Sequence, residues 1–468
     1  MYIADGAHPG SGAFEVIEAA PISAGQERLL MAEFVTAEGI WPDTVEDSRL
    51  RPVDVGLVRI LGPLDVAALE RALTMLIERQ AALRTTFRFP AHGTPVQLVG
   101  PAKAYRLAIH QVDGEPEDYV TVLRRRVIDP RSPRFFEATL FRISARHHVI
   151  ALEIHHLVSD GWSIGVLYRD LSELYSALVT GRPLQLAPLV TSFADQCISM
   201  YRSRRGARMR SEMDYWRGEI GGSWPAIWSR PSHDAPTGSD VEVDDIPVAI
   251  DPVIAEKLTA LSRGLSQRGG LAGPVLAALA ATVSLRTGAT DIRIGAMVSN
   301  RRELAREPLV GYFVNIAVVR LGITPGMSLR QLVAEANAKV AAAVDHQEVP
   351  VQDVIGQLRS ESGQVGEPYE ITVALNNMRK TTLTFEGVEC SDISAPPLGR
   401  RLASTNIKQR WLLEQSGPGL AGTLTYPTAV FDSGEARRYV GRFTTFLDVL
   451  AEGGNDLDRA FSEVRAPT

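Results

Sequence analysis

Apolar residues recur along the first half of the chain with two periods, one typical of strands and one typical of helices. In residues 64–80, leucines recur at near-helical spacing and predict an amphipathic helix, and a second helix is expected over 162–181, where Gly181 and Pro183 end it. Strands are expected at 55–63, 83–88, 134–144 and 147–156. This half therefore alternates strands and helices.

The second half of the chain shows the same alternation of strands and helices. Helices are expected at 275–288 and 328–347, and strands at 291–300, 311–323 and 370–377, before a strand, loop and helix over 420–450. That last order matches the region around residue 155, so two similar lobes are one interpretation and a coincidence of common elements is the other. The expected lobes are 1–185 and 186–468, because the stretch 181–235 is rich in Pro, Gly and Ser. A helix over 193–220 would bridge them.

Bulk properties restrict the class of protein. The 468 residues are 45% hydrophobic and 22% charged, with a formal net charge of −6, which argues against a general nucleic-acid binder. Only two cysteines occur, so neither a secreted disulfide framework nor a CxxC site is expected. No secretory signal and no apolar run long enough for a membrane span is found. These features predict a cytoplasmic globular enzyme or binding protein, with no membrane or nucleic-acid partner.

Two adjacent histidines, His155 and His156, end an apolar strand and meet a turn that contains Asp160 and Gly161. Successive side chains of a strand point to opposite faces, so the two imidazoles cannot play the same role. One can point into a cleft while its neighbour packs inside a lobe. On spacing alone, a buried, hydrogen-bonded histidine pair explains the pattern as well as a catalytic site does.

The chemistry of this turn favours proton transfer over metal binding. Histidine suits a general base because its ordinary pKa, about 6.5, lies near working pH. Asp160 could order the turn or pair with an arginine, and Gly161 permits close backbone approach or a positive φ. The two histidines diverge and no HExxH or Cys/His cluster occurs, so no metal site is expected. Without a GxSxG, P-loop or GxGxxG motif, acyl transfer with no covalent enzyme intermediate is the best remaining class.

Five motifs occur in an order that resembles the condensation domains of nonribosomal peptide synthetases, which have the chloramphenicol-acetyltransferase-like fold. The sequence HHLVSDGWS at 155–163 resembles HHxxxDGxS. Four more segments resemble family motifs: 22–29 resembles SxAQxR, 78–87 resembles RHExLRTxF, 310–320 resembles VGxFVNTxxxR, and 346–351 resembles HQDVPFE. The resemblance spans roughly residues 20–460.

The resemblance implies an α/β (α+β) fold, in which two lobes form a V-shaped pseudo-dimer with a central tunnel. His156 would face the tunnel and position or deprotonate an acceptor amine, supported by His155 and Gly161. Asp160 would be structural and would pair with Arg79. The tunnel wall would be lined by Ser163, Trp162 and Asn315.

The implied reaction needs no cofactor bound by the chain itself. The donor would arrive as a thioester on the phosphopantetheine of an acyl or peptidyl carrier protein, and a carrier-bound or free small acceptor would receive it as an amide. The basic stretch 201–210 could dock an acidic carrier, although a solvated helix face is the simpler interpretation. We expect the chain to carry one activity, as a free-standing enzyme or, alternatively, as a domain of a larger synthetase.

Departures from the family pattern lie outside the histidine turn. The motif YxDxAxW appears at 193–199 without its tryptophan, RDxSRNPLF is barely recognisable near 367–369, and Lys408 stands where an aspartate is expected. These departures keep other functions open. The alternatives are ester formation with a hydroxyl acceptor, a coenzyme-A-dependent acyltransferase, and a non-catalytic module that recruits enzymes to a carrier.

Overall fold

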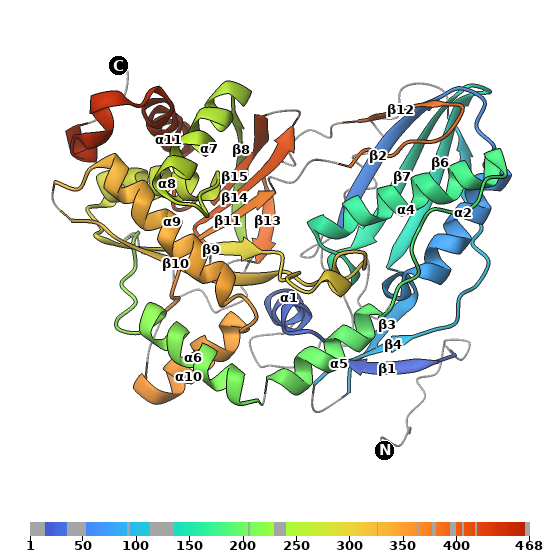
Figure 1. The fold of residues 1–468 in the computed structure, drawn as a ribbon, viewed down its shortest axis with the longest axis horizontal. Helices are drawn as coiled ribbons and strands as arrows, with labels where there is room; N and C mark the ends of the chain where they lie inside the picture. Colours follow the sequence, from blue (N-terminus) through green and yellow to red (C-terminus); the bar gives the residue numbers. More distant parts are fainter. Residues whose placement is uncertain are drawn as a thin grey trace.

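The computed structural model places its helices and strands in two lobes, left and right in Figure 1. Each lobe is built on a mixed sheet with helices packed against it, and the predicted α/β class is confirmed. The described residues are 15–34, 53–90, 94–112, 135–204, 206–228, 240–324, 326–363, 366–376, 381–393, 399–404, 407–416 and 419–463.

The first lobe contains a five-stranded sheet in the order β12-β2-β7-β6-β5. Apolar residues on one face of its central strands pack against the buried leucines of helices α2 and α4. This packing is the core of the lobe. The elements are β2 (Val53–Leu61), β5 (Ala108–Gln111), β6 (Phe136–Ser144), β7 (His147–His155), β12 (Glu389–Asp392), α2 (Val66–Arg79) and α4 (Gly161–Thr180).

The second lobe contains a seven-stranded sheet in the order β10-β9-β11-β14-β15-β8-β13. Helix α8 is buried along almost its whole length, because α9 and α11 both pack against it. The strands are β8 (Asp240–Ile250), β9 (Asp291–Val298), β10 (Asn315–Gly322), β11 (Ile371–Asn376), β13 (Arg401–Ser404), β14 (Gln409–Ser416) and β15 (Gly419–Pro427). The helices are α7 (Pro252–Leu265), α8 (Ala272–Thr287), α9 (Leu329–Asp345) and α11 (Ser433–Glu452).

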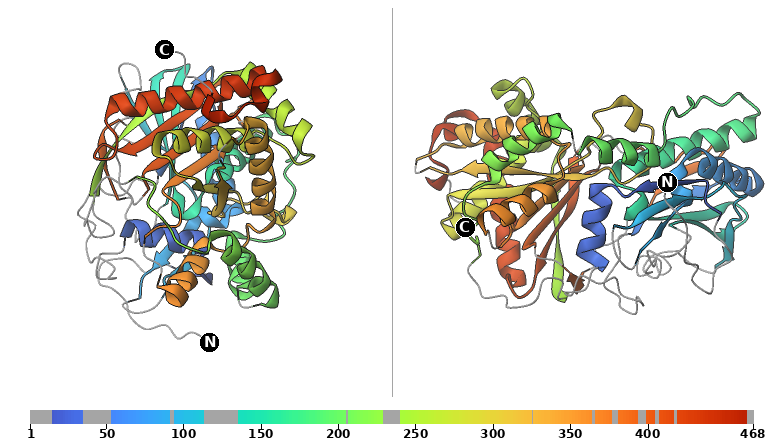
Figure 2. Two further views of the ribbon diagram at one scale, coloured as in Figure 1. Left: turned by 90° about the vertical axis from the view of Figure 1, so that its left-hand side faces the viewer. Right: turned by 90° about the horizontal axis from the view of Figure 1, so that it is seen from below.

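The remaining elements lie along the base of the lobes, and α1 stands between them when the molecule is seen from below (Figure 2). The single helix expected over 193–220 is wrong, since two helices occupy this stretch and Gly206 caps the second. The strand expected from residue 83 begins only at Thr85, because η1 (Ala81–Arg84) forms a 3₁₀ turn. The elements here are β1 (Glu18–Pro21), β3 (Thr85–Arg88), β4 (Val96–Val99), α1 (Ala24–Phe34), α5 (Phe193–Ser203), α6 (Ala207–Ile220) and α10 (Val351–Ser362).

One segment of the second half of the chain crosses into the first lobe. Strand β12 pairs antiparallel with β2, and the two lie side by side in Figure 1. Just before β12, Leu383 and Phe385 join the core of the first lobe, where the Phe385 and Tyr175 ring centroids are 4.3 Å apart. The predicted boundary between residues 185 and 186 stays a prediction. One boundary in the sequence does not describe a chain whose later strand β12 joins the sheet of the first lobe.

The two lobes share one local pattern. Strand β7 leads through a turn into α4, whose N-cap is Asp160, and β15 leads through a turn into α11, whose N-cap is Asp432. Both helices have 20 residues. The histidines occur only in the first copy of this pattern.

Candidate active site

The histidine turn lies at the end of a central strand, where β7 gives way to a helix. The strand ends at His155, a 3₁₀ turn η2 (His156–Val158) follows, and α4 begins at Gly161. The side chain of Asp160 caps α4 by accepting a hydrogen bond from the N–H of Ser163 at 2.9 Å. Aspartate is favoured at an N-cap because it satisfies backbone donors that the first helical turn leaves free.

His155 is a buried, structural histidine. Its Nδ1 accepts a hydrogen bond from the N–H of Leu157 at 3.0 Å, which assigns the proton of the neutral ring to Nε2. The ring of Phe135 packs edge-on against it at 5.3 Å. Burial, and next the nearby His156, hold the pKa of His155 well below its usual 6.5. His155 therefore orders the turn and stays uncharged.

His156 differs from its neighbour, as the strand geometry predicts, because its side chain is only half-buried. Its ring centroid lies 6.4 Å from that of Tyr312, a residue of the second half of the chain. The hydroxyl of Tyr312 accepts a hydrogen bond from Arg28 at 2.9 Å, and Gln26 donates to the carbonyl of Leu157 at 2.6 Å. Helix α1 thereby bonds both to Tyr312 and to the turn that carries His156, and both donors come from the SxAQxR-like segment.

Asp160 is the centre of a buried network between the two halves of the chain. Besides capping α4, its carboxylate accepts hydrogen bonds from the Ser163 hydroxyl at 2.8 Å and from the N–H of Phe313 at 3.1 Å. The guanidinium of Arg301 lies 3.0 and 3.2 Å from its two oxygens. Both charged side chains are almost completely buried, at 1% and 0% exposure. This pair holds the histidine turn against the loop at 301–313.

Arg301 makes several contacts besides its ion pair with Asp160. It donates to the carbonyls of Arg306 and Leu309 at 2.6 and 2.7 Å, and its guanidinium carbon lies 4.3 Å from the centroid of the Phe313 ring. Burial lowers the pKa of Arg301, and the adjacent Asp160 carboxylate opposes that shift. The loop is therefore folded around the Arg301 guanidinium, which is the counter-charge of the Asp160 carboxylate.

The predicted pairing of Asp160 with Arg79 is wrong. Arg79 ends α2 and its Nε lies 3.0 Å from the buried carboxylate of Asp170. Asp170 is ten residues beyond Asp160 on α4, which is roughly 15 Å along a helix. Because α2 packs along α4, its last turn reaches the middle of that helix and not its N-terminus. Next to Arg79, Gln80 accepts from the N–H of Val310 at 2.9 Å and so supports the Arg301 loop.

The three residues expected on the tunnel wall have different positions. Ser163 is fully buried and its hydroxyl oxygen accepts from the N–H of Gly311 at 3.1 Å, so its assignment to the wall is wrong. Trp162 is half-buried and donates from Nε1 to the carbonyl of Glu307 at 2.9 Å. Asn315 does line a cavity, and its amide donates to the carbonyl of Val349 at 2.5 Å.

A side chain from the second half of the chain occupies the space that a Cβ on Gly161 would fill. A Cβ built on Gly161 would lie 2.6 Å from the amide nitrogen of Asn376, at the end of β11. The φ of Gly161 is not positive, so the close approach of Asn376, and not the backbone conformation, is what glycine accommodates here. The start of α4 and the end of β11 thus meet directly beside the histidine turn.

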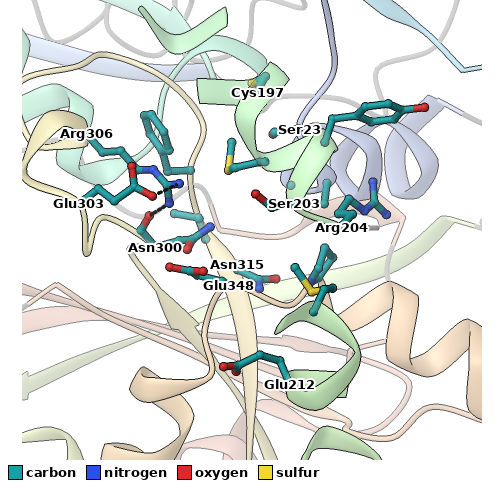
Figure 3. Close-up of a pocket in the computed structure, with 18 of the residues that line it drawn as sticks. Ser23, Cys197, Ser203, Arg204, Glu212, Asn300, Glu303, Arg306, Asn315 and Glu348 are labelled. Atoms are coloured by element: carbon teal, nitrogen blue, oxygen red, sulfur yellow. Dashed lines mark hydrogen bonds and ion pairs between the residues drawn. The ribbon is translucent and has the colours of Figure 1, made fainter. Parts of the chain in front are cut away.

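A cavity of about 320 Å³ opens beside this site, between α1, the α5–α6 junction and the loops around 300–315 (Figure 3). Its wall includes Tyr312, whose ring faces His156 on another side. Arginine and glutamate side chains alternate with apolar ones around it. The charged residues of the wall are Arg204, Arg208, Arg306, Glu212, Glu303 and Glu348.

The basic stretch near residue 201 is largely committed to contacts within the chain. Arg204 donates from Nε to Asp353 on α10 at 2.9 Å and lies 3.4 Å from Glu27 on α1. Arg208 lies 3.5 Å from Glu348. These arginines bind α5 and α6 to neighbouring elements. An ordinary helix surface is therefore better supported for this stretch than a docking site for an acidic carrier.

Sequence reasoning missed the residues that complete the site from the second half of the chain. Arg301 and Asn376 lie outside the five motifs, and nothing in their local pattern marks them. Within the described residues, no three His, Cys, Asp or Glu side chains are grouped as ligands of a metal ion would be. None of the helices in the described ranges has the length and apolar character that a bilayer crossing needs.

Comparisons with known proteins agree with this architecture. The family described as "Condensation domain" matches residues 55–464. The enniatin synthase of Fusarium equiseti is 28% identical over 408 residues, which are 85% of this chain and 12% of that protein. The malpinin synthetase of Mortierella alpina is 27% identical over 396 residues, which are 82% of this chain and 5% of that protein. The chain thus spans a small fraction of the length of these relatives.

Two solved structures show the same fold. The X-domain from teicoplanin biosynthesis superimposes with a TM-score of 0.77 at 22% identity and covers 97% of this chain and 100% of its own. The first condensation domain of the CDA synthetase gives a TM-score of 0.73 at 20% identity and covers the same two fractions. The chain belongs to the condensation-domain family. Condensation domains catalyse peptide-bond formation, which makes this chain an enzyme of the acyltransferase class.

The buried His155 predicts that the protein loses stability in mild acid. In the unfolded chain this imidazole protonates near pH 6.5, whereas in the folded chain it stays neutral because its pKa is held far lower. The unfolded state therefore binds more protons below pH 6.5, so stability is complete above that pH and falls as pH decreases. Urea unfolding at pH 7.5 and 5.5 measures the difference.

The substitution His155→Asn isolates this contribution. Asparagine offers an oxygen to the N–H of Leu157 but does not titrate. The variant is expected to lose less stability than the wild type between these two pH values, while the buried His148, whose pKa is also lowered, keeps part of the dependence. An unchanged pH dependence in the variant would show that His155 is not the responsible group.

Proposed function

We propose that this chain transfers an acyl or aminoacyl group from a phosphopantetheine thioester on a carrier protein to an amine acceptor. The observation that carries the proposal is the complete HHxxxDG turn. His156 is half-buried, while His155 and Asp160 are buried and hold the turn through the Nδ1 of His155 and the carboxylate of Asp160.

The proposed reaction needs one group to manage a proton. The acceptor nitrogen attacks the thioester carbonyl, the C–N bond forms, and the C–S bond breaks to release the pantetheine thiol. His156 positions the amine and takes the proton that nitrogen loses, and the departing sulfur receives a proton in turn. An aminoacyl amine is already partly neutral near pH 7, so positioning accounts for more of the effect with amines than with alcohols.

Two further features support a catalytic domain over a recruitment module. The Asp160–Arg301 pair is buried, which costs desolvation, and it holds the turn in place. The cavity offers room for a small substituent and shares Tyr312 with the surroundings of the imidazole. The chain would bind no cofactor of its own and would receive phosphopantetheine with the substrate.

Product formation tests the proposal. Purified chain is incubated with a panel of acylated carrier proteins and with amine and alcohol acceptors, and products are identified by mass spectrometry. An amide that requires both the carrier-bound donor and the chain is the expected result. An ester as the main product would show that the chain forms esters and not amides. Turnover with free acyl-coenzyme A would show that a carrier-bound donor is not required. Carrier binding without product across the panel would contradict catalysis.

A further inference from the structure

A second pocket lies in the first lobe, at the end of the five-stranded sheet opposite the histidine turn. Strand β7 begins at His147 and ends at His155, so the two ends are roughly 25 Å apart. The pocket lies under the loop that leads into α2. Its lining residues are Leu64, Val66, Gln111, Arg142, Ser144, Ala145 and His148.

Three polar side chains of this pocket form one row across adjacent strands. His148 on β7 lies opposite Arg142 on β6, and Arg142 lies opposite Gln111 on β5. Residues in register on neighbouring strands point to the same face of a sheet. On the same face of the sheet, the next pair of residues is Ile150 and Leu140, and both belong to the apolar core. Polar side chains directly beside this core require an explanation.

Two buried polar atoms of this row have no hydrogen-bond partner in the described part of the chain. His148 is only 2% exposed, yet its Nδ1 makes no hydrogen bond. The Nε of Arg142 is likewise buried without a partner among the described residues. Buried polar atoms are nearly always hydrogen-bonded, to protein, water or a ligand. The row therefore contains polar groups that are not all satisfied by the described residues, beside a pocket with room for a ligand that accepts hydrogen bonds.

The charge of the pocket specifies the sign of that ligand. Arg142 supplies a positive charge, His148 and Gln111 supply donors, and none of the described lining residues is acidic. The 14-residue helix α2 begins at Val66 on the pocket wall, where the positive end of its dipole adds to the field. Its cap, Asp65, is exposed and accepts from Ala68, which is the normal use of an N-cap.

We propose that this pocket binds a phosphate group through Arg142, His148 and Gln111. A phosphate offers enough acceptor oxygens for all three donors, and a guanidinium binds it with paired, charge-assisted hydrogen bonds. Burial, and next the positive charges of Arg142 and His147, lower the pKa of His148, and a bound anion would counter the repulsive part. The ligand is either inorganic phosphate or the phosphate of a phosphomonoester.

Histidine NMR measures the binding directly. The imidazole Cε1–H signals are followed while inorganic phosphate is added at constant ionic strength, and the His148 signal is assigned by its loss in His148→Asn. One saturable shift, confined to His148 and its neighbour His147, is the expected result. No saturable change of the His148 signal would overturn the proposal and leave a pocket that holds water.

Matched arginine variants separate the site from general surface charge. Arg142→Gln is expected to weaken phosphate binding at least about tenfold. Arg146→Gln removes the same charge from the exposed turn next to the pocket and is expected to leave the affinity unchanged. Equal weakening by the two substitutions would show that the anion is attracted only by surface charge.

Two controls complete the design. The exposed Gln111→Leu provides a second variant that tests the same site if Arg142→Gln does not fold, and it is also expected to weaken binding. Glycerol phosphate is titrated beside inorganic phosphate. Equal affinities assign the site to the terminal oxyanion, and tighter binding of glycerol phosphate assigns it to a phosphomonoester. Neither result depends on the acyl-transfer reaction.

Discussion

Replacing His156 by alanine is expected to lower turnover by about 10²- to 10⁴-fold, the usual contribution of a positioned proton-transfer group. The side chain is half-buried and the turn is held by His155, Asp160 and Gln26, so the fold should survive the change. The measurement compares initial rates of product formation for the variant and wild type under saturating donor and acceptor. Thermal unfolding of both proteins shows that the variant is folded.

The acceptor separates the two roles of the imidazole. An alcohol must lose its proton during attack, whereas an aminoacyl amine is partly neutral at the outset. A base is therefore expected to matter more for alcohols, and equal losses with both acceptors would assign His156 to positioning. His110→Ala removes an exposed histidine of β5 and serves as the control, with turnover expected to stay at the wild-type level. Wild-type turnover by His156→Ala would contradict the proposed mechanism.

Replacing Asp160 by alanine is expected to cost about 3–5 kcal/mol of unfolding free energy, since it leaves the Arg301 guanidinium buried without its counter-charge. The helix cap is lost as well, which accounts for about 1 kcal/mol of that cost. Urea denaturation measures the change. The control is Asp458→Ala, which breaks an exposed pair with Arg330 and is expected to leave the unfolding free energy nearly unchanged, because water screens such a pair.

A double-mutant cycle identifies the partner of Asp160. Substitutions of residues in direct contact are non-additive, whereas those of separate pairs add. Asp160→Ala and Arg301→Met are therefore expected to couple, and Asp160→Ala and Arg79→Met to be additive. Coupling with Arg79 and additivity with Arg301 would contradict the geometry of the site.

The fold class and the histidine turn were predictable from the sequence because their causes are local. Periodicity places the helices and strands, and the strand that ends at His155 and the turn that begins at His156 give the two imidazoles different surroundings, one buried and one half-buried. The turn that follows β7 contains an aspartate at the N-cap and a glycine at the first helical position, which together start a helix. None of these features depends on distant residues.

The tertiary structure alone decided which partners meet. Asp160 and Arg301 are 141 positions apart, and no local pattern says which arginine reaches a given carboxylate. Arg79 is excluded by the way α2 packs along α4, and Arg301 is brought in by a loop folded around its guanidinium. The crossing of β12 into the first lobe and the contact of Asn376 with Gly161 have the same origin. Such contacts follow from how whole elements pack, which depends on side chains spread over both lobes. The local sequence therefore determined the helices and strands, and the tertiary structure determined which of their residues contact one another.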